Sequence, residues 1–516
     1  MQLSDRAWRT IRACPSAPRD NSAFPSQLED WVEMKKITVC PYHYTLPCLW
    51  EDMSEQKRKR SWWKWLLSLT LLALLTPVIV LLVFKASTEK AWEQYEAEWH
   101  SRDPFSVSHY LPAPVPKSQN LAFHPLFENL EKRGSPAHTW FASFRANPAC
   151  PGAQDDFRAN PATMQRSDLS RIASVALLDS KKERIAELVR LNQPVSEQLD
   201  QLSEALAQRP HYHVPHPWHD SLLLLETESS GLQILSAAHG YLLRATLHLH
   251  SENPSGAAAD ITSCLRLSSV VGQDPLLMNL LAECKLRSLA LSALWDGLAG
   301  KSWSEEDLRK LGKKLSTIPP AHDRLLNVIR VSRAQVLGLI DQLQDFSAGG
   351  GSGKAPALTR FFLAANRLSY CRDLQECILA PGGELAQQTT RSGLRRYEER
   401  LQDRAQGLSK YINAPSLMMA TSFSGPFSST LESDGEVLAA RWAIEIELHR
   451  AIHGSYPSTL EALTPTALKT LEAAVTKGQK TVYQLKKDGT PVISIEWTAG
   501  TGPAKDIVWS YPPSNP

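Results

Sequence analysis

Histidines are gathered in one short stretch of this chain, "HYHVPHPWH", and that stretch is the first candidate for chemistry. His211, His213, His216 and His219 fall within nine residues. Imidazole nitrogens this close together can bind zinc or copper. The interspersed prolines predict a loop between helices, and no carboxylate or cysteine lies at a fixed ligand spacing. A metal site and a plain polar loop are both open interpretations.

A second group of potential ligands lies near the C-terminus, where Glu445, His449 and His453 are spaced four residues apart. On a helix this spacing puts all three side chains on one face, which can hold a metal ion. The stretch does not match H-E-x-x-H. The neighbouring apolar positions form a stripe expected to be buried: Ile444, Leu448 and Ile452. We therefore expect Glu445, His449 and His453 to lie on a solvent-exposed side of the helix, with a metal site as the alternative.

Other catalytic motifs fail on their required residues. "GGGSGKAP" invites comparison with a phosphate-binding loop, but Ala348 stands where the first glycine is required. Ala355 replaces the Ser or Thr, and Pro356 would stop the following helix. The chain has no G-x-S-x-G and no paired C-x-x-C motif. Because no carboxylate is marked for acid–base work, the sequence favours a protein that is not an enzyme and binds no cofactor.

An apolar run near the N-terminus predicts a membrane anchor. Trp65 to Phe84 is twenty residues without a charge. A helix of that length, rising about 1.5 Å per residue, spans the hydrocarbon core of roughly 30 Å. Trp62, Trp63 and Trp65 lie where an interfacial aromatic belt is expected. A buried soluble helix and a cleaved signal peptide are the alternatives, but no small-x-small cleavage site follows the run. We predict a retained signal-anchor.

Charge sets the expected orientation of this anchor. Four basic residues precede it: Lys57, Arg58, Lys59 and Arg60. The far side opens with Lys85 and then Glu89. The positive-inside rule therefore makes residues 53–64 a basic cytoplasmic segment and puts the long C-terminal part outside the cytoplasm.

Residues 1–52 have a different character, with three of the eight cysteines and no sustained helix or strand period. Met53 opens "MSEQKRKRSWWKW", the usual layout of a signal-anchor, so we predict a disordered or non-native extension before a natural start at Met53. A small metal site in "CPYHYTLPC" (Cys40, His43 and Cys48) is the alternative, but its spacing matches no common zinc pattern.

Composition limits the functional classes. The formal charge is +2 and the sequence has no stripe of basic residues, so it lacks the charge pattern of a nucleic-acid-binding protein. Five cysteines follow the anchor, an odd number that does not make a disulfide framework. Cys264 and Cys284 fall on apolar helix faces, so buried thiols are expected.

Apolar spacing predicts a mainly α fold beyond the anchor. Asn253, Asp274 and Ser304 are helix-start signals. Capped helices joined by short turns predict antiparallel hairpins packed in a solenoid-like array. The expected segments are a juxtamembrane helix with a proline-rich connector (85–165), a helical domain (166–346), a Gly/Ser linker (347–356), a helical segment with an irregular connector from residue 413 (357–430) and an α+β module (431–516).

The last segment predicts a helix from about Gly435 to Ile452, ending at Gly454. Two strands are expected around Asp488-Gly489, a strong hairpin signal, and "DIVWSYP" adds a third.

This C-terminal motif resembles a known segment. "AIEIELHRAIHGSYPSTLEAL", with Gly454, Tyr456, Pro457 and Leu460, is similar to the C-terminal part of type II secretion pseudopilins. The resemblance implies a helix, a Gly-x-Tyr-Pro turn, a short Leu-rich helix and a small sheet. Residues 57–516 as a whole resemble a family of uncharacterised membrane-anchored proteins of planctomycete- and verrucomicrobial-type bacteria. No prepilin peptidase site precedes the anchor, which argues against assembly into a pilus.

The sequence thus predicts a single-pass bacterial inner-membrane protein, in contact with lipid through one span, whose extracytoplasmic helical scaffold binds a protein partner in the cell envelope. A metal-dependent envelope hydrolase and a secretion-system component are the alternatives.

Overall fold

The computed structural model describes residues 55–147, 157–216, 218, 230–346, 362–407, 410, 413, 417, 422–475, 479–497 and 506–511. The chain divides into two compact units, Met1–Leu75 and Thr76–Pro516, each considered by itself. The expected extension at residues 1–52, the start at Met53 and the linker at 347–356 lie outside the described residues.

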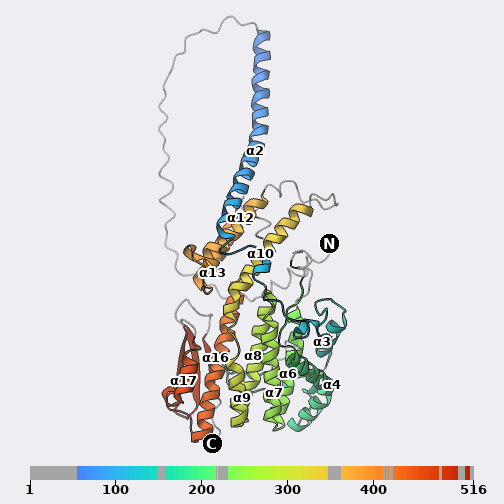
Figure 1. The fold of residues 1–516 in the computed structure, drawn as a ribbon, viewed down its shortest axis with the longest axis vertical. Helices are drawn as coiled ribbons and strands as arrows, with labels where there is room; N and C mark the ends of the chain where they lie inside the picture. The colour runs from blue at the N-terminus through green and yellow to red at the C-terminus, as the bar shows by residue number, and fades with distance from the viewer. Residues whose placement is uncertain are drawn as a thin grey trace. The chain divides into compact units, whose positions relative to one another are not determined.

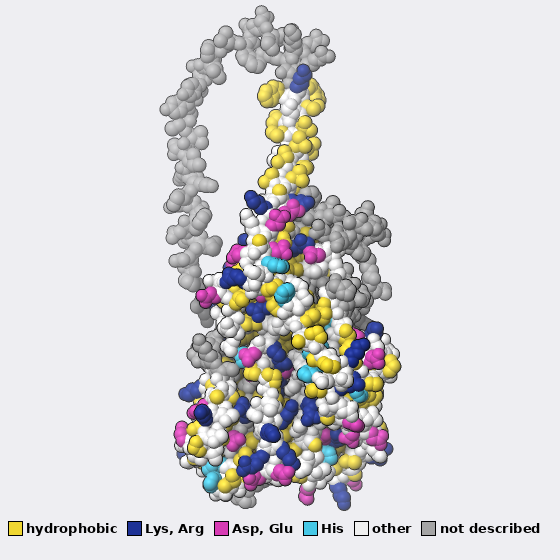
Figure 2. Space-filling model, viewed as in Figure 1, with side chains coloured by type: hydrophobic (Ala, Val, Ile, Leu, Met, Phe, Trp, Pro, Cys, Tyr) yellow, Lys and Arg dark blue, Asp and Glu magenta, His cyan; other side chains and the backbone are white. Residues whose placement is uncertain are grey.

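One long helix, α2 (Glu55–Trp99), carries the apolar run, with Pro77 inside it. Its first turns contain Lys57, Arg58, Lys59 and Arg60. Apolar side chains cover its surface, and the rings of Trp62, Trp63 and Trp65 are exposed (Figure 2). Over the described part of the chain, α2 is the one helix long and apolar enough to cross a membrane. It continues past Phe84, so the apolar run and the juxtamembrane helix are one element.

The connector after α2 contains more helix than its prolines predict. Short 3-10 turns η1 (Val107–His109) and η2 (Leu121–Phe123) are followed by the helix α3 (Pro136–Ala146). Ser135 caps α3, since its hydroxyl oxygen accepts from the His138 N–H at 3.0 Å. Helix α3 is therefore an element that the expected proline-rich connector did not include.

The helical body forms where apolar spacing predicts it. After the 3-10 turns η3 (Leu169–Arg171) and η4 (Ala173–Val175), its helices are α4 (Lys181–Gln208), α6 (Ser230–His250), α7 (Pro254–Val271), α8 (Leu277–Ala299), α9 (Glu305–Ser316) and α10 (His322–Phe346). Helices α6, α7 and α8 pack on one another, side by side in Figure 1.

Two of the three predicted helix starts are confirmed. Asn253 caps α7 and Ser304 caps α9, each side-chain oxygen accepting from the backbone N–H three residues on. The start at Asp274 is wrong, because α8 begins at Leu277. The Asp274 carboxylate accepts instead from the side-chain amide of Asn279 at 2.7 Å.

Beyond the Gly/Ser stretch, helix α12 (Leu363–Leu374) runs into a π-helical turn, η5 (Gln375–Leu379). A 3-10 turn, η6 (Pro381–Gly383), then leads to α13 (Arg391–Arg404). Such π turns inside helices are often found at functional sites.

Helix α16 (Ser424–His453) begins before the predicted start near Gly435. The expected irregular segment is therefore wrong from Ser424 on, and the expected segment boundary after residue 430 falls inside this helix. The predicted end is confirmed, since Gly454 takes the left-handed conformation (φ +77°) that stops the helix.

A small antiparallel sheet follows the 3-10 turn η7 (Leu460–Ala462) and helix α17 (Pro465–Glu472). Its strands lie in the order β1 (Gln479–Leu485), β2 (Pro491–Trp497) and β3 (Ile507–Ser510). Tyr483 pairs with Ile493, which pairs in turn with Trp509. The hairpin predicted at Asp488-Gly489 is confirmed, and Gly489 supplies the positive φ of 76°.

The sheet and the helical body share one core. Ile493 and Trp509 of the sheet belong to the same buried cluster as Leu286 of α8. Gly435 allows the sheet to approach α16, because a Cβ there would lie 2.6 Å from the Trp497 ring. The segments expected as a helical domain and a C-terminal module are thus packed together.

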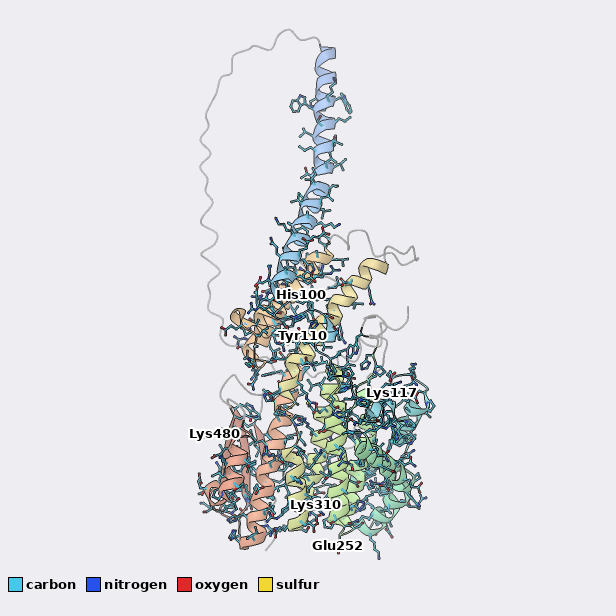
Figure 3. All side chains as sticks on the ribbon, in the orientation of Figure 1. His100, Tyr110, Lys117, Glu252, Lys310 and Lys480 are labelled. Carbon is cyan, nitrogen blue, oxygen red and sulfur yellow. The ribbon has the colours of Figure 1, made fainter. Side chains whose placement is uncertain are left out.

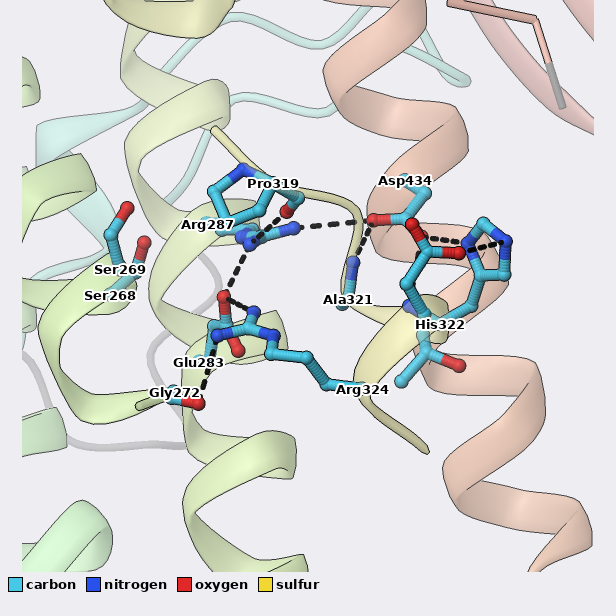
Figure 4. A network of polar contacts seen from close by, with 12 residues as sticks. Ser268, Ser269, Gly272, Glu283, Arg287, Pro319, Ala321, His322, Arg324 and Asp434 are labelled. Atoms are coloured by element: carbon cyan, nitrogen blue, oxygen red, sulfur yellow. Dashed lines mark hydrogen bonds and ion pairs between the residues drawn. The ribbon is translucent and has the colours of Figure 1, made fainter. Parts of the chain in front are cut away.

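A buried ion network joins α8, α10 and α16 (Figure 4). Arg287 donates to Asp434 at 3.2 Å and also to Glu283. Arg324 donates to the same glutamate. His322 Nδ1 lies 2.6 Å from Asp434 Oδ2. Since buried charges are costly unless paired, this network fixes how the three helices meet.

Candidate functional site

Three aromatic residues fix the end of α2 to the rest of its unit. Trp92, Tyr95 and Trp99 are spaced three and four residues apart, so they share one face of the helix. All three are buried, in a cluster that includes Ile329 of α10 and Tyr370 of α12. The helix that carries the apolar run therefore ends inside the core.

Asp103, just beyond α2, is held by side chains from distant segments. Its carboxylate accepts from Arg333 at 2.8 Å and from Arg330 at 3.0 Å, both on α10. It also accepts from the Tyr110 hydroxyl at 2.7 Å and from Gln375 of the π turn at 3.0 Å. Burial alone would raise the pKa of Asp103, but the Arg333 guanidinium and the other donors hold that pKa below its ordinary value. The carboxylate therefore stays ionised and locks the chain after α2 onto α10.

A cavity of about 630 Å³ opens beside this junction. It lies between the end of α2, the chain that follows, α10 and α12, and we name it the Trp92 cavity. Its aromatic and charged wall residues are Trp92, Glu96, His100, Phe105, His216, Trp218, Asp341 and Arg367. Figure 3 shows His100 at the end of α2.

The wall of the Trp92 cavity offers binding groups more than catalytic ones. Arg367 donates to Asp341 in an ion pair. Ser106 and Ser108 are hydrogen-bonded to each other at 2.8 Å, and over the described residues neither hydroxyl is bonded to a histidine base. Aromatic rings next to charges of both signs suit the anchoring of an apolar or charged side chain from a ligand.

Among the described histidines of the predicted cluster, His216 is the one that lines this cavity. Its Nε2 lies 2.7 Å from Asp274 Oδ2, and its ring packs edge-on against Trp218 with centroids 4.9 Å apart. Within the described part of the structure, its Nδ1 has no hydrogen-bond partner.

The other described histidines of that stretch, His211 and His213, do not join His216 in a metal-binding group. The backbone of His213 is held in place by a hydrogen bond, in which its carbonyl accepts from the Asn120 side-chain amide at 2.9 Å. The rings of His211 and His213 are 6.2 Å apart, and His219 lies outside the described residues. Among the side chains that are described, no group of three or more His, Cys, Asp or Glu residues could hold a metal ion.

The second predicted ligand group, Glu445, His449 and His453, also forms no metal-binding group among the described side chains. The rings of His449 and His453 lie 4.4 Å apart, as expected for one helix face. Glu445 instead lines a different cavity, of about 310 Å³, with Arg441. Ile452, expected to be buried, is 55% exposed because the last turn of α16 lies at the surface.

The C-terminal motif with Gly454, Tyr456, Pro457 and Leu460 has a structural role in this chain. The Tyr456 hydroxyl donates to Glu447 of α16 at 2.8 Å, and the Pro457 carbonyl accepts from the Tyr483 hydroxyl at 2.7 Å. Leu460 opens η7 and packs against the main core. These contacts tie the end of α16 to β1.

Sequence reasoning missed the residues around the Trp92 cavity. The spacing of Trp92, Tyr95 and Trp99 was a usable signal for a buried face. Asp103 and Arg333 gave none, because they belong to segments that only the fold brings together.

Comparison of the chain with protein-family models, with curated proteins and with solved structures finds no match. Membership of the membrane-anchored family therefore stays a prediction.

Proposed function

We propose that this chain is a single-span bacterial inner-membrane protein that binds a protein partner in the cell envelope. Its N-terminus would lie in the cytoplasm, and the chain after Phe84 would lie outside it. The Trp92 cavity carries the proposal, because its wall includes the helix that bears the apolar run. Trp92 lies eight positions after Phe84, which is about 12 Å of helix. A partner bound there would lie close to the membrane surface.

The chemistry of the wall favours a protein segment as the ligand. Trp and Arg side chains are enriched where partners anchor to each other. Trp92 and Trp218 offer aromatic surface, while Arg367 and Asp341 offer both charges to a segment that mixes apolar and charged residues. The packed helical hairpins of the body, arranged in a solenoid-like array, would supply the rest of the scaffold.

Photo-crosslinking in native membranes tests this proposal. A photo-reactive residue replaces His100 in the cavity wall or, as the control, Lys310, which is exposed on α9 far from His100 (Figure 3). We expect a discrete crosslinked protein from position 100 and none from position 310. Arg367→Ala should weaken the product. An identical pattern from both positions, or no product from either, argues against a partner at this cavity.

A secretion-system component is the second candidate, favoured by the order of elements at the C-terminus. Helix α16 ends at Gly454, the turn holds Tyr456, and a short helix and a three-stranded sheet follow. This is the order that the pseudopilin resemblance implies. Recovery of a secretin or secretion ATPase with the crosslinked chain would support this role, and its absence from the crosslinked product would count against it.

A metal-dependent envelope hydrolase has no comparable support. His216 is turned to Asp274, and among the described side chains Glu445, His449 and His453 form no group that could hold a metal ion. Stoichiometric zinc in the purified full chain is the result that would favour this activity.

A further inference from the structure

A separate cavity of about 270 Å³ lies among the segment at residues 158–161, α8, α16 and β3. We name it the Arg158 cavity. Its wall is mostly polar and contains Arg158, Asn160, Lys285, Ser288, Ser292, Glu436 and Trp509. It shares no wall residue with the Trp92 cavity.

Two cations in this wall act on each other. Burial lowers the pKa of Lys285, and the neighbouring charge of Arg158 lowers it further. Burial, with the charges of Arg158, Lys285 and Arg145, lowers the pKa of His239 on α6 to about 4. Over the described residues, neither Arg158 nor Lys285 forms an ion pair with a carboxylate. Like charges held together without such a pair are stabilised when an anion lies between them.

The nearest carboxyl group in the wall does not neutralise these cations fully. Burial raises the pKa of Glu436 to about 7. The Ser288 hydroxyl and Lys285, both on α8, act to lower that pKa, whereas Glu432, one turn away on α16, acts to raise it. Near neutral pH this carboxyl group is therefore ionised in only part of the molecules.

Hydrogen-bond donors complete the lining. The Asn160 side-chain oxygen accepts from the Ala162 N–H at 3.0 Å, which turns its amide nitrogen the other way as a donor. Ser292 donates its hydroxyl hydrogen to the Ala159 carbonyl at 2.7 Å, so that hydrogen is not available to a ligand. Trp509, 2% exposed, closes the cavity on the side of the sheet.

We infer that the Arg158 cavity binds a small anionic group, a phosphate or a carboxylate, held between Arg158 and Lys285. A guanidinium group presents two parallel donors to such an oxyanion, and an ammonium group adds a compact charge. Ionised Glu436 opposes binding, and protonated Glu436 permits it. This site lies outside the proposed partner-binding function and does not depend on it.

Sulfate binding to the full chain in detergent micelles tests the inference, because sulfate stays a dianion throughout the neutral pH range and its own charge does not change. Isothermal titration should show saturable binding. Arg158→Gln and Lys285→Gln should each weaken it by about tenfold or more. Arg158→Lys should retain part of the affinity. Lys310→Gln, which removes an exposed cation of α9, is the matched control and should change nothing. Thermal unfolding without sulfate checks that the variants fold.

The pH dependence gives a second, independent readout. Glu436 loses its proton as pH rises through about 7, so wild-type affinity for sulfate should be higher at about pH 6 than at about pH 8. Glu436→Gln should bind with the higher affinity at both pH values. His239 stays neutral over this range and should not contribute.

Competition against sulfate then separates the two ligand classes. Displacement by inorganic phosphate or by succinate supports the site and names the class that it prefers. The inference is overturned if the wild-type chain shows no saturable sulfate binding, if both Gln variants bind as the wild type does, or if neither competitor displaces sulfate.

Discussion

Asp103 and Arg333, separated by 230 residues in the sequence, form a buried ion pair with 2.8 Å between Oδ2 and Nη1. Arg333 also donates to the Pro104 carbonyl at 2.8 Å, and its guanidinium lies 4.7 Å from the centre of the Phe105 ring. Because Phe105 lines the Trp92 cavity, this one arginine connects the stability of α10 with the shape of the candidate binding site.

Removal of that arginine should destabilise the second unit strongly. Arg333→Ala leaves the Asp103 carboxylate buried with less compensation, which we expect to cost about 3–5 kcal/mol of unfolding free energy. Urea unfolding of the full chain in mild detergent measures the change. Arg190→Ala, which breaks the exposed pair with Glu187 on α4, should leave the urea midpoint unchanged. Equal midpoints for the two variants would contradict a structural role for Arg333.

His322 should give the stability a pH dependence of a defined sign. Burial alone would lower its pKa, but the hydrogen bond and charge of Asp434, helped by Asp323, raise it above the ordinary histidine value. The stabilisation is fully present below the unfolded-state pKa of about 6.5 and is lost as pH rises through the higher folded-state pKa.

Comparison with a variant isolates this effect. The difference in unfolding free energy between the wild type and His322→Gln should be largest under mildly acidic conditions and should shrink as pH rises. His109→Gln, at an exposed position, should show no such trend. A difference that grows with pH would mean that the ion pair with Asp434 does not govern this histidine.

Two glycines of α16 offer a matched test of how the sheet packs. Gly435→Ala places a methyl group 2.6 Å from the Trp497 ring and 3.1 Å from Ile507, so it should cost about 1–3 kcal/mol of stability. Gly425→Ala meets nothing within 4 Å and should be neutral or stabilising by up to about 1 kcal/mol. Chemical unfolding of both variants checks the contrast, and similar effects would show that Gly435 is not required for the sheet to approach α16.

Reporter fusions test the proposed topology. Alkaline phosphatase, which needs an oxidising compartment, should be active at the C-terminus and inactive when fused after Arg60. Replacing the four basic residues at 57–60 with Gln should increase the inverted fraction, since their charge sets the orientation. Activity of the reporter after Arg60 in the unaltered chain would reverse the proposed orientation.

Local sequence signals explain why the helix caps and the hairpin turn were predicted correctly. They also explain why the first turns of α16 were missed. Asn253 and Ser304 cap helices through bonds that span three residues, and Gly489 forms a turn within its own hairpin. The first turns of α16 were missed because glycine, proline and serine disfavour a helix locally. Buried Phe427 and Leu431 hold those turns against the second core cluster, so packing outweighs propensity there.

The sequence by itself determined the apolar run of α2, the mainly helical body and the C-terminal hairpin. Each depends on composition or spacing within a few turns of chain. The tertiary structure alone decided that Asp103 meets Arg333, that Arg158 lies beside Lys285, and that the described members of the predicted histidine groups form no metal-binding cluster. Those relationships depend on which faces of distant helices pack together, and packing is settled by the fit of whole surfaces rather than by neighbouring residues.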